Sequence, residues 1–421
     1  MTTGEPSAPG TPEADGTDGT DSTDSTDSTD RHPAPFSGTF GPELVTALRE
    51  RLPQLLDDLG ELVRVESPSS DQDAVRASAA VVAPQGERAL GEPPEVVDVD
   101  GCRHLRWRLG DGPRRVLVLC HHDTVWPVGT LDRMPWSVTD GVARGPGCFD
   151  MLAGLVQGLH GLAALRERGV SLDGVTVLVT GDEETGSPTS RALIEAEAAG
   201  CDAALVLEAS ADGGALKTGR KGASLYRVRV EGRAAHAGLE PERGVNATVE
   251  LAHQVLTVAE LGDAALGTSV TPTALTSGTT LNTVPAQGEL SVDARALTVD
   301  EQQRVHTAMT ALTPTVEGSQ VQVTGGPNRP PLEPALTATL FAAAQTVAER
   351  LDLPALTGVT VGGASDGNFT AGVGVPTLDG LGAVGGGAHG DDEHVVVDTM
   401  PERAALLAGL VAHLLANADD R

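Results

Sequence analysis

The stretch Arg115-Val-Leu-Val-Leu-Cys120 decides the fold, because a short, continuous apolar run of this kind is typical of a buried parallel strand. Two later runs have the same character, Val175-Thr-Val-Leu-Val-Thr180 and Ala203-Ala-Leu-Val-Leu207. Helical stretches separate the three runs, at 152–168 and at 190–199. This alternation predicts an α/β fold, with a mixed, largely parallel sheet flanked by helices and joined by right-handed crossovers.

Each apolar run is followed at once by a histidine or a carboxylate. His121-His122-Asp123 follows the first run, Asp182-Glu183-Glu184 follows the second after one glycine, and Glu208 follows the third. Ligands of open α/β sheets bind just beyond the carboxyl ends of the strands, so we expect these side chains to meet at one edge. Two glycine-rich loops add Asp150, at the end of 144–150, and a histidine from the segment 385–394.

A set of histidines, aspartate and glutamates without paired cysteines suits two divalent ions. Nitrogen and oxygen ligands favour zinc, with cobalt or manganese as alternatives. Strand alternation puts His121 and Asp123 on one side and His122 on the other. Metal-bound histidines usually donate their second N–H to a carboxylate, which suits Asp123. His122 stays open as an alternative to His121, and His394 as an alternative to His389.

Five motifs in this order resemble one known family. They are His121-His-Asp-Thr-Val125, Gly145-Pro-Gly-Cys-Phe-Asp150, Asp182-Glu-Glu-Thr-Gly-Ser187, Val206-Leu-Glu208 and Gly232-Arg-Ala-Ala-His236-Ala-Gly238. From about Pro42 to Asn417 the chain is similar to the M20-type zinc peptidases and deacylases. This family includes carboxypeptidase G2 (glutamate carboxypeptidase), aminoacylase-1, acetylornithine deacetylase and succinyl-diaminopimelate desuccinylase. The order of the motifs leans toward the carboxypeptidase G2-like branch.

The resemblance implies a role for each matching residue. The implied metal ligands are Asp150 as the bridge between two ions, His121 and Glu208 on one ion, and Glu184 and His389 on the other. Glu183 would be the general base, and Asp123 would orient His121. The implied substrate contacts are His236, Asn282, Arg295 and Gly363. Plainer readings stay open for two of these, a capped surface histidine for His236 and a surface ion pair for Arg295.

The resemblance also implies details around the bridging residue. The peptide after Asp150 is often cis in relatives, and we expect the same here. Relatives commonly carry a lysine two residues after this aspartate, whereas this chain has Leu152. All five expected ligands are present, so the departure bears on the choice of substrate rather than on metal binding.

The implied function is hydrolysis of an amide or peptide bond next to a free carboxylate, as in an N-acyl amino acid or a short peptide. Metal-activated water would attack with Glu183 as the base. The alternatives within enzymes are a deacetylase- or desuccinylase-like deacylase and a dipeptidase. The alternative outside enzymes is an inactive binding or scaffold homologue, whose mark would be the loss of Glu183 or of a ligand, and the chain retains all of them.

The sequence divides into a tail, a split catalytic domain and an insertion. Residues 1–38 are rich in Thr, Ser, Asp and Gly and are expected to form a disordered acidic tail. The catalytic domain is expected at 39–217 and 328–421, opening with one amphipathic helix over 42–65 and another helix at 73–82. The insertion, 218–327, alternates polar and apolar residues at 224–230 and 288–294 and has helices at 245–261 and 301–312. It is expected to form an α+β domain that, by the resemblance, makes a homodimer.

Composition excludes some partners. The 421 residues include 59 acidic and 29 basic side chains, for a net charge of -30, which would repel nucleic acid. An uninterrupted apolar run of about 18 residues, as a membrane span needs, is not found, and residues 1–30 lack the features of a secretory signal. The four cysteines form no Cys-x-x-Cys pair. A cytoplasmic enzyme with a small-molecule substrate is therefore expected.

Overall fold

The computed structural model describes residues 40–417, and the predicted acidic tail at 1–38 lies outside this range. The central sheet has six strands in the order β1-β2-β6-β3-β7-β16. Their bounds are β1 Glu95–Val99, β2 Cys102–Arg108, β3 Val116–His121, β6 Val175–Thr180, β7 Ala203–Val206 and β16 Thr377–Leu378. Strands β6, β3, β7 and β16 are parallel, and β2 and β1 continue the sheet in antiparallel pairing. The predicted mixed, largely parallel sheet is confirmed.

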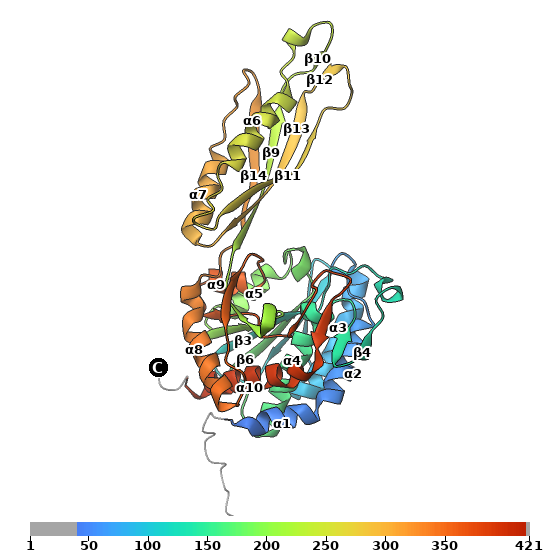
Figure 1. The fold of residues 1–421 in the computed structure, drawn as a ribbon, viewed down its shortest axis with the longest axis vertical. Coiled ribbons are helices and arrows are strands. Elements are labelled where there is room, and N and C mark those ends of the chain that lie inside the picture. Colours follow the sequence, from blue (N-terminus) through green and yellow to red (C-terminus); the bar gives the residue numbers. More distant parts are fainter. Residues whose placement is uncertain (1–39, 418–421) are drawn as a thin grey trace, which may run out of the picture. The chain divides into compact units, whose positions relative to one another are not determined.

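Alternate residues of the central strands fill two separate apolar layers. Val116, Val118 and Cys120 belong to the larger core with helices on one face, whereas Leu117 and Leu119 pack with α5 and α9 on the other. The helices of this domain are α1 Pro42–Glu50, α2 Leu52–Val63, α3 Gln72–Leu90, α4 Ala153–Glu167, α5 Arg191–Ala198, α8 Pro334–Arg350, α9 Gly367–Gly372 and α10 Met400–Ala416 (Figure 1). Burial on both faces explains why the strands are apolar throughout.

Two predicted helices were wrong in their bounds. The single opening helix expected over 42–65 is two helices, because Pro53 lacks an N–H and is tolerated only in the first turn of a new helix. Helix α3 does not stop near Val82 but continues past Pro84 to Leu90. Its later part is held by packing, since Ala89 and Leu90 are buried in the main core.

Helix α4 is long and apolar. Together with the turn before it, Cys148–Glu167, it has a mean hydropathy of 1.4 over its most apolar window, enough by length and composition alone for a membrane span. However, 89% of that window is buried inside the domain, where α4 packs on α10, α3 and α2. Burial in the core accounts for the apolar composition.

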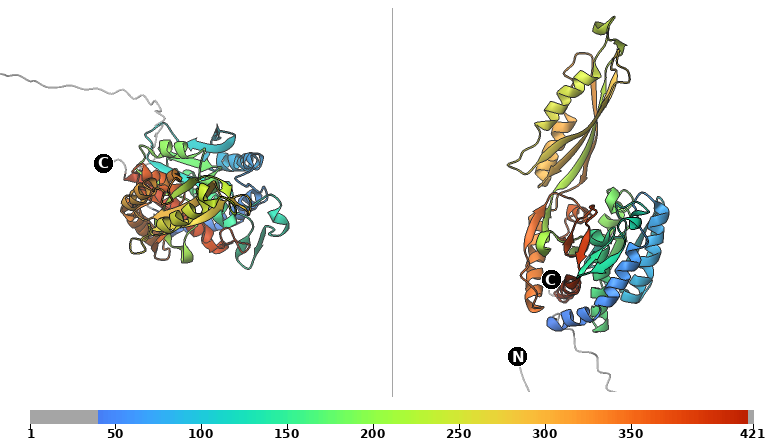
Figure 2. Two further views of the ribbon diagram at one scale, coloured as in Figure 1. Left: turned by 90° about the horizontal axis from the view of Figure 1, so that it is seen from above. Right: turned by 45° about the vertical axis from the view of Figure 1, so that its right-hand side comes forward.

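The inserted segment forms its own antiparallel sheet, in the order β11-β13-β9-β14. The elements are β9 Gly222–Glu231, β10 Ala235–His236, α6 Ala247–Ala259, β11 Ser269–Ser277, β12 Thr283–Val284, β13 Gln287–Ala296, α7 Val299–Thr310 and β14 Gln320–Arg329. Both helices lie on one face of the sheet (Figure 2), sharing a core with Val228 and Val292. Strands β10 and β12 pair as a separate ribbon. The expected α+β character is observed, and the exact domain boundaries stay a prediction.

Two smaller sheets complete the fold. Strands β8 Leu216–Arg220 and β15 Gly358–Val361 form a parallel pair. Strands β4 Ser137–Thr139, β5 Val142–Arg144, β17 Gly385–Gly386 and β18 His394–Val396 form a four-stranded sheet in the order β17-β18-β5-β4. This last sheet brings the loop of His389 next to the turn that precedes Asp150.

Gly86 gives a test of the packing between α3 and the sheet. A Cβ atom at this position would lie 2.3 Å from Cζ2 of Trp107, whose rigid side chain is 1% exposed. We expect Gly86→Ala to lower the free energy of unfolding by about 1–3 kcal/mol, because overpacking outweighs the better helix propensity of alanine. Denaturant unfolding measures this. In a Trp107→Leu background the same substitution should become neutral or stabilising, and an equal loss in both backgrounds would contradict the packing argument.

Candidate active site

The carboxyl ends of three adjacent strands carry the central residues of the site. In the parallel register, His121 at the end of β3 lies beside Thr180 at the end of β6, and Leu119 lies beside Val206 of β7. The residues just beyond these ends therefore share one edge of the sheet, as the sequence predicted. Glu183 and Glu184 begin a short 3-10 turn there, and Glu208 follows β7 by two residues.

One imidazole faces two carboxylates inside the protein. Nε2 of His121 lies 3.5 Å from Oε1 of Glu208 and 3.7 Å from Oδ1 of Asp150. Nδ1 of the same ring is 2.9 Å from the backbone oxygen of Asp123 and 3.4 Å from its Oδ1. The ring is thereby oriented with Nε2 toward Asp150 and Glu208.

A second imidazole faces the other side of Asp150. Nε2 of His389 lies 3.5 Å from Oδ2 of Asp150 and 3.3 Å from Oε2 of Glu184. The two oxygens of Asp150 thus face two different histidines. The peptide bond between Asp150 and Met151 is cis, which confirms the expectation from the family. Unlike His121, the His389 side chain is about half exposed, at 52%.

The donor atoms fit a pair of metal ions. Two ligands at ~2.1 Å from one ion in tetrahedral geometry are about 3.4 Å apart, close to the spacings between each imidazole and its carboxylates. Nε2 of His121 and Oε1 of Glu184 are buried without a hydrogen-bond partner. Buried polar atoms rarely stay unpaired, so these two atoms are suited to binding an ion.

The crowded carboxylates also favour protonation of the two imidazoles. Hydrogen bonds that His389 donates to the carboxylates of Asp150 and Glu184 raise its pKa to about 10. Burial opposes charge on His121, but the neighbouring carboxylates of Asp123, Asp150 and Glu208 still raise its pKa well above the ordinary value. In the protein without metal, both rings are therefore protonated at neutral pH and balance part of the negative charge.

Glu183 lies beside this cluster with a different set of contacts. Its carboxylate is buried, and Oε1 is 3.0 Å from Nη2 of Arg329. Burial raises the pKa of Glu183 well above its ordinary value; Asp366 and Glu208 add to this shift, and Arg329 opposes it. A carboxylate with a raised pKa is suited to accepting a proton near neutral pH.

Asp123 holds the turn that carries Glu183 and Glu184. Its Oδ1 accepts the backbone N–H of Glu183, and its Oδ2 accepts that of Glu184, both at 3.2 Å. The hydroxyl of Ser69 donates to Oδ2 at 2.5 Å. Asp123 therefore orients His121 through its backbone oxygen and fixes both glutamates through its carboxylate.

The two alternative histidines lie apart from the cluster. Nε2 of His122 is 3.2 Å from the backbone oxygen of Arg103, and burial lowers the pKa of His122 to about 4. Nδ1 of His394 contacts the backbone oxygen of Asp392 at 2.9 Å. The geometry therefore favours His121 and His389 as the residues that join the carboxylates.

The predicted substrate-binding residues are not gathered at this cluster. His236, on β10, accepts the N–H groups of Gly238 and Leu239 at Nδ1 and is exposed, as in the capped reading. The backbone oxygen of Asn282 accepts the N–H of Ala237, which holds the β10–β12 ribbon. Over residues 40–417, no described contact links His236 or Asn282 to the five clustered residues.

Arg295 and Gly363 have other partners. The guanidinium of Arg295 makes two 2.8 Å hydrogen bonds to the carboxylate of Asp293 on the same strand, as in the ion-pair reading. Gly363 is closer to the cluster, because its carbonyl accepts a hydrogen bond of 3.1 Å from Arg220. Arg220 in turn lies 3.5 Å from Glu208 and binds Asp379 through two bonds.

Four charged residues around the cluster were not predicted from the sequence. They are Lys217, Arg220, Arg329 and Glu393. Nζ of Lys217 is 3.9 Å from Oε2 of Glu208, and Arg329 bridges Glu183 and Asp366. The only sequence signal for Arg329 is its position at the end of a strand, directly before two prolines.

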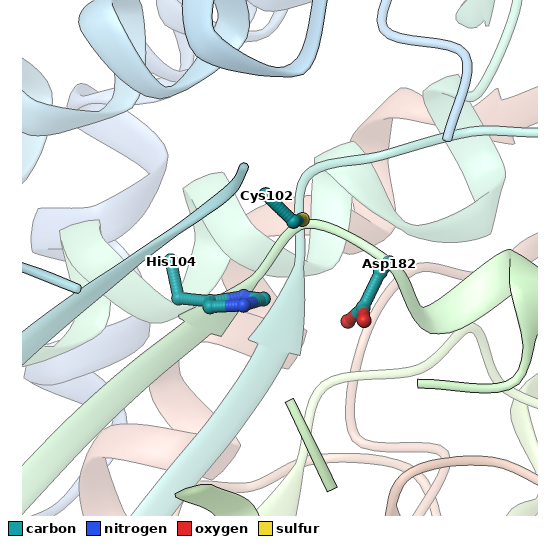
Figure 3. Close-up of side chains that lie close together, drawn as sticks. All are labelled: Cys102, His104 and Asp182. Carbon is teal, nitrogen blue, oxygen red and sulfur yellow. The ribbon is translucent and has the colours of Figure 1, made fainter. Parts of the chain in front are cut away.

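A second group of possible ligands, Cys102, His104 and Asp182, lies close together, with Asp182 directly before Glu183 in the sequence (Figure 3). Nδ1 of His104 accepts the N–H of Gly181, and Nε2 contacts the hydroxyl of Thr189, which donates to Asp182. Burial raises the pKa of the Cys102 thiol to about 11, whereas a metal requires the thiolate. These three residues therefore act as a hydrogen-bonded support for the segment 181–190.

Comparison with known proteins places this arrangement among peptidases. The family model described as peptidase family M20/M25/M40 matches residues 117–413. Carboxypeptidase G2 of Pseudomonas sp. (strain RS-16) is 30% identical over 384 residues, covering 88% of this chain and 92% of that protein.

Two solved structures share the fold. Aminopeptidase PepT from Bacillus cereus ATCC 10987 has a TM-score of 0.67 at 21% identity, with 86% of this chain and 99% of that chain covered. The YXEP protein of Bacillus subtilis, described as a dinuclear metal binding peptidase, has a TM-score of 0.59 at 14% identity, with 86% and 98% covered.

The raised pKa of His389 predicts how the metal-free protein responds to pH. A histidine whose pKa is about 10 when folded and 6.5 when unfolded stabilises the fold below pH 6.5, and this contribution is lost as the pH rises toward about 10. The melting temperature in chelator should therefore fall between about pH 7 and pH 10. His389→Gln should show a shallower fall. Parallel curves for the two proteins would contradict the assigned contacts.

Proposed function

This chain belongs to peptidase family M20/M25/M40, and we propose that it holds two divalent ions and cleaves an amide bond next to a free carboxylate. As a carboxypeptidase G2 homologue it is a metallopeptidase; the ion pair and the substrate class are the proposal. One observation carries it. The two oxygens of Asp150 face His121 and His389, with Glu208 and Glu184 completing the two sides.

In this proposal the two ions share one ligand, Asp150. His121 and Glu208 would complete the ligands of one ion, and Glu184 and His389 would complete those of the other. Imidazole and carboxylate ligands favour zinc, with cobalt or manganese as alternatives. Such ions, when bound, lower the pKa of water toward about 7 and polarise a carbonyl oxygen.

Glu183 performs the proton transfers. Its buried carboxylate accepts a proton from the attacking water and later donates it to the nitrogen of the leaving amine. The ion pair with Arg329, with 3.0 Å between Nη2 and Oε1, keeps Oε1 in place, and the same Nη2 donates a hydrogen bond of 3.2 Å to the backbone oxygen of Glu183. Asp123 fixes the backbone of Glu183, so the base is held from both its main chain and its side chain.

Positive charge beside the cluster supports a substrate with a free carboxylate. Lys217 and Arg220 lie within 3.9 Å of Glu208, and Arg329 lies beside Glu183. Arg295, which the sequence analysis put forward for this task, is engaged with Asp293. Arg220 and Arg329 also have carboxylate partners, Asp379 and Asp366. Their nearness to the cluster, rather than a free guanidinium, makes them and Lys217 the better candidates for the substrate carboxylate.

A homodimer and a cytoplasmic location also remain proposals. Exposed apolar side chains on the inserted domain, Val249 and Leu256 on α6 and Leu275 on β11, support a self-association surface there. A mass near 43.0 kDa in sedimentation would contradict the dimer.

All four cysteines are free and buried, which suits a reducing compartment. Cell fractionation tests the location.

Substitution of the base separates its role from that of a ligand. Glu183→Gln should lower kcat by about 10²- to 10⁴-fold, because a general base contributes that much, while both metal equivalents remain bound. Steady-state kinetics and elemental analysis measure the two effects. Glu195→Gln, the same change on α5, is the control. Retained activity would contradict the base assignment, and the loss of one metal equivalent would make Glu183 a ligand.

The substrate class is tested by paired compounds. N-acyl amino acids, dipeptides, N-acetylornithine and N-succinyl-diaminopimelate are each assayed with zinc, cobalt and manganese, beside analogues in which the free carboxylate is a carboxamide. The carboxamides should lose at least about 30-fold in kcat/KM, because an unpaired partner of a buried charge pair costs about 2–5 kcal/mol. Equal turnover of both forms would refute carboxylate recognition. Inactivity throughout would favour the scaffold alternative.

A further inference from the structure

We propose that Glu393 is a positioning residue that fixes the bridging Asp150 relative to His389, an inference that rests on the proposed two-metal function. Glu393 is 1% exposed and lies four residues after His389. Its carboxylate contacts none of the side chains that make up the cluster of His121, Asp150, Glu184, Glu208 and His389. It binds instead the backbone of the turn that ends at Asp150.

The carboxylate of Glu393 has four donors. Oε1 accepts the backbone N–H groups of Phe149 at 2.9 Å and of Asp150 at 3.0 Å. Oε2 accepts the N–H of Gly147 at 3.0 Å and the indole N–H of Trp126 at 2.7 Å. A carboxylate offers about four acceptor directions, so its bonding capacity is fully used. Three of the four bonds hold the backbone of one turn, residues 147–150.

The turn needs this external support because it is not regular. Asp150 and Met151 have dihedral angles outside the helical region, and Gly147 has a φ of 72°. A Cβ on Gly147 would lie 2.3 Å from Cγ2 of Thr124, so the turn also passes very close to the segment after β3. The N–H groups that Glu393 binds would otherwise be buried without partners.

The loop of His389 is compact, and Glu393 closes it. Gly385 and Gly386 pair with Val395 and His394, and the N–H of Glu393 binds the carbonyl of Gly390 at 3.0 Å. His389 projects from this loop with a φ of 61° and a side chain that is about half exposed. Little burial holds His389 in place, so its distance from Asp150 depends on how the two backbones are joined.

The two halves of the cluster therefore differ in their dependence on Glu393. His121 is 2% exposed, lies on the central strand β3 and is oriented by Asp123. Neither support involves Glu393, and the shared residue Asp150 is the one part of this half that lies on the turn bound by Glu393. Loss of the Glu393 carboxylate should release the metal on the His389 and Glu184 side, while the metal on the His121 and Glu208 side stays more tightly bound.

The experiment measures the retention of each metal in Glu393→Gln. The amide replaces one acceptor oxygen with a donor that faces N–H groups, and a change behind a metal ligand typically costs about 10- to 100-fold in metal affinity. We expect the wild type to keep two equivalents of zinc under a limiting chelator and Glu393→Gln to keep about one, as His389→Ala should. Cobalt absorption at each loading step gives a second readout.

Glu250→Gln is the matched control. Glu250 is also fully buried, on α6, and accepts the backbone N–H groups of Thr315 and Val316 and the hydroxyl of Ser319. This variant should lose a similar amount of stability and keep both metals. If Glu393→Gln does not fold, Trp126→Phe removes one donor and leaves the carboxylate, and the same metal should weaken by a smaller factor.

The outcomes separate this inference from the proposed function. A wild-type protein that binds fewer than two ions refutes the two-metal function itself. If the wild type binds two ions and Glu393→Gln or Trp126→Phe also binds two with unchanged affinity, only the positioning role is overturned. Equal weakening of both metals, or the same loss in Glu250→Gln, would also overturn it, because a general loss of stability would then explain the effect.

Discussion

The crowding of buried carboxylates at one edge of the central sheet is the constraint on which the rest of the structure depends. Asp123, Asp150, Glu183 and Glu208 are close together, and like charges in a water-poor site repel strongly unless cations compensate them. The protein supplies part of that compensation with protonated imidazoles and with Lys217, Arg220 and Arg329. The proposed ions would take the place of the protons on these imidazoles, because a histidine binds a metal through an unprotonated ring nitrogen. The same feature therefore organises both the stability of the site and its chemistry.

Most of the support for this edge comes from side chains that bind backbone rather than other side chains. Asp123 holds the N–H groups of Glu183 and Glu184, Asp182 holds those of Thr189 and Ser190, and Glu393 holds the turn at Asp150. Each carboxylate fixes one loop at a strand end. The catalytic groups therefore lie on loops, and hydrogen bonds from buried carboxylates to the loop backbones set their positions.

The sequence predicted the sheet for a physical reason. A continuous apolar run marks a strand buried on both faces, and the residues after it must emerge at the strand end, so a histidine or carboxylate could be expected at one edge after each of the three runs. The choice of His121, Glu184 and Glu208 as ligands came from the resemblance to the family. Local patterns were less able to set helix ends: packing carries α3 past Pro84, and Pro53 divides the opening helix. Contacts such as Arg329 with Glu183, or Glu393 with Asp150, join residues 146 and 243 positions apart, and periodicity holds no information about them. The same limit applies to Arg295. The sequence showed Asp293 nearby, but it could not tell whether Arg295 binds this aspartate or a substrate carboxylate.

Strand β14 ends at Arg329, the residue whose guanidinium touches Glu183 and Asp366. Strand β14 of the inserted sheet thus runs two residues past the expected end of the insertion at 327 and brings a charge to the catalytic edge. The insertion is consequently not an interchangeable module. A chimera in which another protein's equivalent segment replaces the insertion would have to keep the register of this strand end. Otherwise Glu183 would lose the positive charge of Arg329 beside it.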